Sequence, residues 1–119
     1  LLKKKFCFFK KKKNFSQCKN KKSLRNLSMV MRMQKPIKYE DRIKNIEDGV
    51  KFAKEAVELD PTDGTSWSVL GNAYLSSFFN LAQYPSVLNL CKSAYAQAVS
   101  LYNNITFNHV KEKIFLSIF

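Results

Sequence analysis

Residues 67–74, WSVLGNAY, decide the fold of this 119-residue chain. Residues three and four apart in a helix share a face, so Trp67, Leu70, Gly71 and Tyr74 form one stripe. The two aromatic residues supply large areas for burial. A glycine inside a helix costs about 1 kcal/mol relative to alanine, so Gly71 indicates a close approach of a second helix. The stretch predicts a tightly packed helix over residues 64–80. Taken alone, it also fits an ordinary amphipathic helix with a chance glycine.

The sequence before this stretch favours the tightly packed interpretation. In residues 56–61, AVELDP, small Ala56 allows a close approach between helices, and Leu59 is expected to close the core. Pro61 cannot continue a helix, so it ends the one before. Asp63 is expected to cap the next helix by accepting hydrogen bonds from its free N–H groups. Six residues separate Pro61 from Trp67, which is the phase of a known repeat.

The sequence after the stretch supplies the second helix of that repeat. Tyr95 and Ala98 stand three apart, and Cys91 takes the small position before them. The spacing W-x2-L-G-x2-Y together with these flanks is typical of the tetratricopeptide repeat, a hairpin of two helices. Sixteen residues lie between Tyr74 and Cys91, where the standard repeat has eight. We therefore expect a longer first helix or a larger turn before a second helix that begins near Ser86.

The rest of the chain fits an all-α fold of helical hairpins with poorly ordered termini. Apolar spacing predicts further helices over residues 22–33 and 40–59. We divide the chain into a basic tail (1–17), a repeat region (18–102, with one full, enlarged repeat at about 61–100) and an irregular tail (103–119). The last segment is expected to be a strand, a short helix or sequence from outside the reading frame. The chain lacks an initiator Met, and we interpret it as part of a longer protein.

Charge is divided unevenly along the chain. Residues 1–44 hold 16 Lys/Arg against 2 Asp/Glu, whereas residues 45–102 hold 3 against 6. A nucleic-acid interface would therefore rest on the first third. Residues 1–15 are lysine blocks around Phe and Cys, and three interpretations remain open. The first is a disordered tail. The second, which we favour, is sequence from outside the native coding frame. The third is an arm that binds anionic lipid or RNA or directs nuclear import.

The sequence offers no arrangement of residues suited to catalysis or to a cofactor. The three cysteines are far apart, and His109 is the single histidine, so neither a nucleophile–base pair nor a metal site is expected. No apolar run approaches the roughly 20 residues of a membrane span. We expect a protein that is not an enzyme and that has no cofactor, small-molecule substrate or membrane partner. Phe78 and Phe79 are the candidate partner surface if they are exposed.

Three stretches resemble one family in particular. They are CKNKKSLRNLSMVMR (18–32), GVKFAKEAVELDPTDGTSWSVLGNAYLSSFFN (49–80) and SAYAQA (93–98). Together they are similar to the family of tetratricopeptide repeat protein 5, also called Strap. The resemblance implies a scaffold that assembles stress-responsive transcription coactivators. It also implies recognition of nascent tubulin at the ribosome, which triggers decay of tubulin mRNA.

The sequence and the resemblance together predict a protein-binding scaffold. Its partners are expected to be proteins or peptides that dock on the groove of the stacked helices. The alternative is an RNA- or ribosome-associated module that binds through basic residues 3–44. The absence of a disulfide pattern and the resemblance favour a location in the cytoplasm and nucleus.

Overall fold

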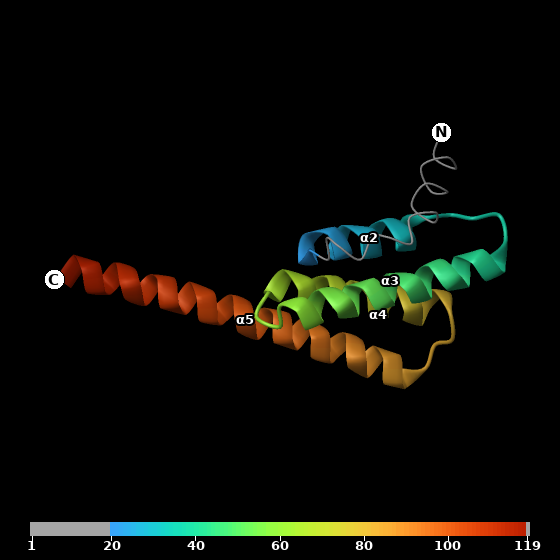
Figure 1. The fold of residues 1–119 in the computed structure, drawn as a ribbon. Helices are drawn as coiled ribbons and strands as arrows, with labels where there is room; N and C mark the ends of the chain where they lie inside the picture. Colours follow the sequence, from blue (N-terminus) through green and yellow to red (C-terminus); the bar gives the residue numbers. More distant parts are fainter. Residues whose placement is uncertain (1–19, 119) are drawn as a thin grey trace.

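A computed structural model describes residues 20–118 as four helices, with no strand in that range. The helices are α2 (Lys21–Met33), α3 (Tyr39–Leu59), α4 (Gly64–Asn80) and α5 (Pro85–Ile118). They run back and forth as two hairpins, α2–α3 and α4–α5 (Figure 1). Each helix contacts the next, and α2 also contacts α4. The prediction of an all-α repeat fold is confirmed.

Local chemistry fixes where the helices begin and end. Asn20 caps α2, because its side chain accepts a hydrogen bond of 2.8 Å from the backbone N–H of Lys22. Asp63 caps α4 by accepting from the backbone N–H of Thr65 at 3.2 Å, as predicted. Pro61 lies in the link directly after α3. The helices over 21–33, 39–59 and 64–80 thus begin within one residue of their predicted positions.

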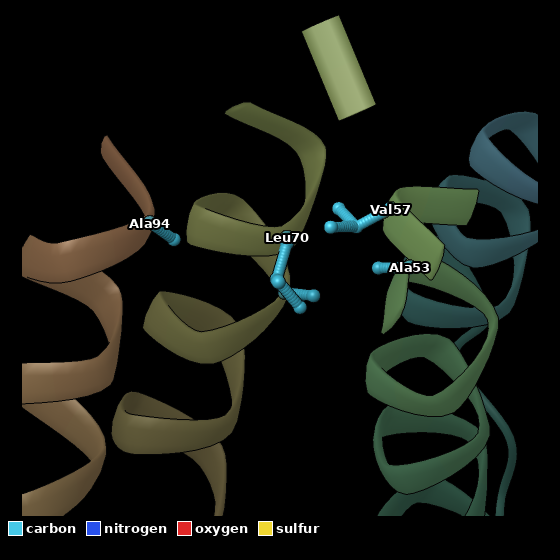
Figure 2. Packing of buried hydrophobic residues seen from close by; sticks show 5 residues of the cluster. Ala53, Val57, Leu70 and Ala94 are labelled. Atoms are coloured by element: carbon cyan, nitrogen blue, oxygen red, sulfur yellow. The ribbon is translucent and has the colours of Figure 1, made fainter. Parts of the chain in front are cut away.

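The core lies on both sides of α4, against α3 and against α5. Figure 2 shows Leu70 of α4 between Ala53 and Val57 of α3 on one side and Ala94 of α5 on the other. Alanine at the contact points lets the helix backbones approach closely, and Leu70 fills the space between them. The half-buried side chains that pack against this cluster are Val50, Trp67, Val69 and Tyr74.

Leu59 does not close the core, and that prediction is wrong. Its side chain is 50% exposed, whereas Val57, two residues earlier, is 8% exposed. Residues two apart on a helix point about 200° apart, so only one of the two can face α4. Leu59 is also the last residue of α3.

The long insertion is absorbed by both helices of the second hairpin. α4 continues to Asn80, six residues past Tyr74, and α5 begins at Pro85, six residues before Cys91. The link between them is only residues 81–84.

The end of the chain corrects a second prediction. Residues 103–118 continue α5 instead of forming an irregular tail. No glycine or proline follows Pro85, so nothing in the sequence stops the helix. Figure 1 shows this part of α5 extending beyond the other helices. The interpretations of the tail over residues 1–17 lie outside the described residues, and so does the side chain of His109.

Candidate functional site

The two helices of the second hairpin touch at Gly71. A Cβ placed there would lie 2.7 and 2.8 Å from two ring atoms of Tyr95, closer than real Cβ atoms come. The Gly71 carbonyl also accepts a hydrogen bond of 3.4 Å from Sγ of buried Cys91. Burial raises the pKa of the Cys91 thiol, which favours the protonated donor. Because Gly71 has no side chain, the ring of Tyr95 can pack directly against α4 at this position.

The first hairpin has a matching contact at Gly49. The side chain of Ser28 is fully buried, and its hydroxyl donates a hydrogen bond of 2.6 Å to the Gly49 carbonyl. A Cβ at Gly49 would lie 2.6 Å from Cγ of Arg32 and 3.2 Å from the Ser28 carbonyl. The aliphatic stem of Arg32 therefore crosses α3 over the glycine.

Basic residues of α2 hold the link between α3 and α4. The ammonium group of Lys21 pairs with Asp60 at 2.5 Å, and the guanidinium of Arg25 pairs with Asp63. Hydrogen bonds from Lys21 and from Thr62 lower the pKa of Asp60 to about 2. The positive charges of Lys21 and Arg25 are therefore neutralised by carboxylates of the α3–α4 link.

Arg32 belongs to the same face of α2 but has no carboxylate partner in the part of the chain that the structure describes. It lies seven residues after Arg25, which is two helical turns. Its Nε–H group is buried and donates to no hydrogen-bond acceptor among the described residues. Burial lowers the pKa of its guanidinium, although the nearby Tyr95 partly opposes this. A half-buried cation with an unused donor is suited to bind a carboxylate that arrives from outside.

Tyr95 lies close enough to Arg32 to affect its pKa, and Asn72 is hydrogen-bonded to Tyr95. The hydroxyl of Tyr95 donates a hydrogen bond to Oδ1 of exposed Asn72 on α4. This hydrogen bond joins α5 to α4, and the charge of Arg32 on α2 opposes the rise that burial causes in the pKa of Tyr95. We call Arg32, Asn72 and Tyr95 the Arg32 site.

The helix face that carries Asn72 is polar. On α4, the side opposite the Trp67 stripe is lined by Thr65, Ser68, Asn72 and Ser76. An open hollow of about 650 Å³ runs along α5 from Tyr95, lined by Tyr95, Ala96, Val99, Ser100, Asn103 and Asn104. A peptide at the Arg32 site would therefore find polar groups on α4 and a partly apolar surface on α5.

The predicted residues divide between core and surface. Ala56, Leu70, Gly71, Cys91 and Ala98 are buried, as close packing requires. Phe79 is exposed, and Phe78 is half-buried with its ring edge-to-face to Phe79 at 5.4 Å between centroids. Only Phe79 of this pair is therefore open to a partner.

The sequence reasoning missed Arg32. It was one basic residue among many in the first third of the chain, and nothing in its immediate neighbours distinguishes it. The available signal was its spacing from Lys21 and Arg25, which places all three on one helix face.

Other kinds of site are not formed in the part of the chain that the structure describes. There, no group of three or more His, Cys, Asp or Glu side chains is placed to hold a metal ion. None of the described helices combines the length and the apolar character needed to span a membrane.

Comparison with known proteins identifies the relatives of this chain. Tetratricopeptide repeat protein 5 from Bos taurus and from Mus musculus is 48% identical over 83 residues, and the Homo sapiens protein is 45% identical over 83 residues. The match covers 70% of this chain and 19% of each relative, so the chain spans about a fifth of their length. No family model matches the chain. Over the matched residues, these identities support a chain that is similar to one part of tetratricopeptide repeat protein 5.

Proposed function

We propose that this chain is the part of a protein-binding scaffold that receives a peptide between α2 and α4. The observation that carries the proposal is the half-buried, unpaired Arg32, placed beside two basic residues that are already paired. The preferred ligand is an extended segment with a carboxylate. Its charge would bind Arg32 and its polar groups would meet Asn72.

The resemblance supports a finer version of this proposal. Members of the family recognise nascent tubulin at the ribosome, which leads to decay of tubulin mRNA, and assemble stress-responsive transcription coactivators. We propose the same two roles for the protein to which this chain belongs, in the cytoplasm and nucleus. A docking site for short peptide segments is compatible with both roles.

The test is binding of a labelled synthetic peptide with the sequence of a tubulin N-terminus, followed by fluorescence anisotropy. Arg32→Ala should weaken binding about tenfold or more, because a hydrogen bond to a charged group contributes about 1.5–3 kcal/mol. Arg32→Lys should recover part of the loss, since it keeps the charge without the planar fork.

Lys22→Ala is the matched control, because Lys22 is an exposed cation on the same helix. It should leave the affinity within about twofold of the parent. Equal affinities for the parent and Arg32→Ala would contradict the proposal. Circular dichroism of each variant shows whether the helices are retained.

Binding to RNA through basic residues 3–44 is the other outcome that this experiment can detect. Lys21 and Arg25 are paired with carboxylates, so fewer cations are available to phosphate than the sequence suggests. An RNA oligonucleotide that bound tightly, with affinity falling steeply as salt is added, would favour that function instead.

A further inference from the structure

Exposed apolar side chains gather at one end of the bundle. The α2–α3 link and the α4–α5 link lie at this same end (Figure 1). The first link carries Ile37, which is 96% exposed, between exposed Met33 and Tyr39. The second is flanked by Phe79 and Tyr84, both more than 60% exposed. Links are normally polar, so large apolar groups on both of them indicate a contact surface.

The backbone beneath these side chains is held in place. The carbonyl of Tyr84 accepts a hydrogen bond of 3.0 Å from the N–H of Val87, and its own N–H donates to Ala82 at 2.7 Å. Pro36 and Pro85 restrict the chain beside Ile37 and Tyr84. An exposed side chain on a fixed backbone loses little freedom when it binds a partner.

A hydrogen bond joins the two links into one surface. The guanidinium of Arg42, near the start of α3, donates to the side-chain oxygen of Asn80 at the end of α4. The side-chain amide of Asn80 donates in turn to the carbonyl of Ser76 at 2.8 Å. This chain of contacts connects the ends of α3 and α4.

The charge of this end is positive. Residues 33–44 hold four Lys/Arg against two Asp/Glu, and residues 77–88 hold no charged residue. Lys35 and Lys38 directly flank the Pro36–Ile37 pair. Glu40 and Asp41 fall in the first turn of α3, where the helix dipole favours negative charge. The lysines beside Ile37 are thus the charges available to a partner.

We propose that this end of the bundle is a second docking surface, which binds an acidic amphipathic segment of another protein. The surface consists of Met33, Ile37, Tyr39, Phe79 and Tyr84 with Lys35 and Lys38, and we call it the link-end surface. Apolar side chains of the segment would cover the exposed Ile37 and the aromatic rings. Its carboxylates would pair with the two lysines.

The alternation of charges favours a protein segment over a membrane or RNA. Glu40 and Asp41 lie close in sequence to the lysines, and they would be repelled by a uniformly anionic surface. A peptide can place its carboxylates on the lysines only.

The experiment uses a labelled synthetic peptide that forms a helix with glutamates on one face and leucines on the other. One matched peptide replaces the glutamates with lysines, and another replaces the leucines with serines. We expect only the first to bind. Ile37→Ser and the double variant Lys35→Glu/Lys38→Glu should each weaken it roughly tenfold. These positions are exposed, so the fold should be kept, which circular dichroism verifies.

Control variants separate this surface from the rest of the molecule. Val99→Ser removes an exposed apolar side chain from α5, and Lys22→Glu reverses a charge at the far end of α2. Neither should change the affinity. Ile37→Ser should leave binding of the tubulin N-terminal peptide at the Arg32 site unchanged, so failure here and failure at the Arg32 site can be told apart.

Four results would overturn the proposal, the last of them being binding to RNA. The first is equal binding of the acidic and basic peptides, and the second is equal loss in the controls and in Ile37→Ser. The third is the absence of peptide binding together with Ile37-dependent cosedimentation with phosphatidylserine vesicles, which would assign the surface to membranes. RNA binding that depended on Lys35 and Lys38 but not on Ile37 would assign it to nucleic acid.

Discussion

The two hairpins make the same contact with their parts exchanged. In α2–α3 the glycine belongs to the second helix, and the donor to its carbonyl is Ser28 of the first. In α4–α5 the glycine belongs to the first helix, and the donor is Cys91 of the second. The first helices of the two hairpins carry residues at the same spacing. These residues are Leu24, Leu27, Ser28 and Met31 in α2, and Trp67, Leu70, Gly71 and Tyr74 in α4.

This exchange teaches that the repeat requires one small residue on each side of the contact but not a particular helix for the glycine. What differs is the group that crosses the glycine. It is the flexible stem of Arg32 in the first hairpin and the rigid ring of Tyr95 in the second. The first hairpin should therefore tolerate added volume better than the second.

The largest expected effect is that of Gly71→Leu. The new side chain would overlap the ring of Tyr95, so the free energy of unfolding should fall by roughly 1–3 kcal/mol or more. Thermal unfolding followed by circular dichroism measures this. Combining Gly71→Ala with Tyr95→Ala is the control, because removing the ring should relieve the penalty of the added methyl group. An unchanged melting temperature for Gly71→Leu would contradict the contact.

Ser28→Ala tests the donor in the first hairpin. Loss of the buried hydrogen bond to Gly49 should lower the free energy of unfolding by about 0.5–1.5 kcal/mol. Cys91→Ala is the matched change in the second hairpin, and its hydrogen-bond component should be smaller because a thiol is a weak donor. Urea unfolding of both variants compares them. A Cys91→Ala loss well beyond that of Ser28→Ala would mean that the packing of Cys91 outweighs its hydrogen bond.

Gly49→Ala should change stability by less than about 1 kcal/mol. Alanine has a higher helix propensity than glycine, and this gain offsets the cost of displacing the side chain of Arg32. The backbone carbonyl of Ser28 cannot move in the same way, so it limits how far the contact can relax. The displacement should instead appear as weaker peptide binding at the Arg32 site. Gly71→Ala is the comparison, and it should be the more destabilising of the two. A larger loss of stability in Gly49→Ala than in Gly71→Ala would contradict the distinction between the flexible stem of Arg32 and the rigid ring of Tyr95.

The smallest effect concerns the ion pairs of α2. The pKa of Asp60 is about 2 in the folded chain, against 3.8 for a free side chain. A carboxyl group with a lowered folded pKa stabilises the fold above its unfolded value. This contribution should therefore be lost as the pH falls from about 3.8 to 2. In Asp60→Asn, the melting temperature should therefore fall less steeply over that pH range than in the parent. An equally steep fall would show that the Lys21–Asp60 pair is not the cause.

The sequence predicted best those features that depend on packing at regular spacing. The stripe from Trp67 to Tyr74 fixed α4, and Asp63 fixed its start. The continuation of α5 past residue 102 could not be predicted in this way, because apolar spacing reports a packed face and this part extends away from the bundle. Its helix persists only because no residue breaks it.

The sequence predicted the candidate sites less well than it predicted the helices. Arg32 differs from Lys21 and Arg25 in having no carboxylate partner among the described residues, and that depends on where the α3–α4 link lies in three dimensions. Leu59 and Val57 are both apolar residues near the end of α3. The angle of α4 against α3 decides which of them is covered.

The ion pairs of α2 also set an order of events during synthesis. Lys21 and Arg25 bind carboxylates that lie 39 and 38 residues further along the chain. A ribosome adds about 5–20 residues per second, so α2 is made roughly 2–8 seconds before its partners exist. During that interval its basic face is unpaired and open to whatever surrounds the emerging chain. Arrival of Asp60 and Asp63 ends the interval, and of the three basic residues on this face of α2, Arg32 is the one without a carboxylate partner among the described residues.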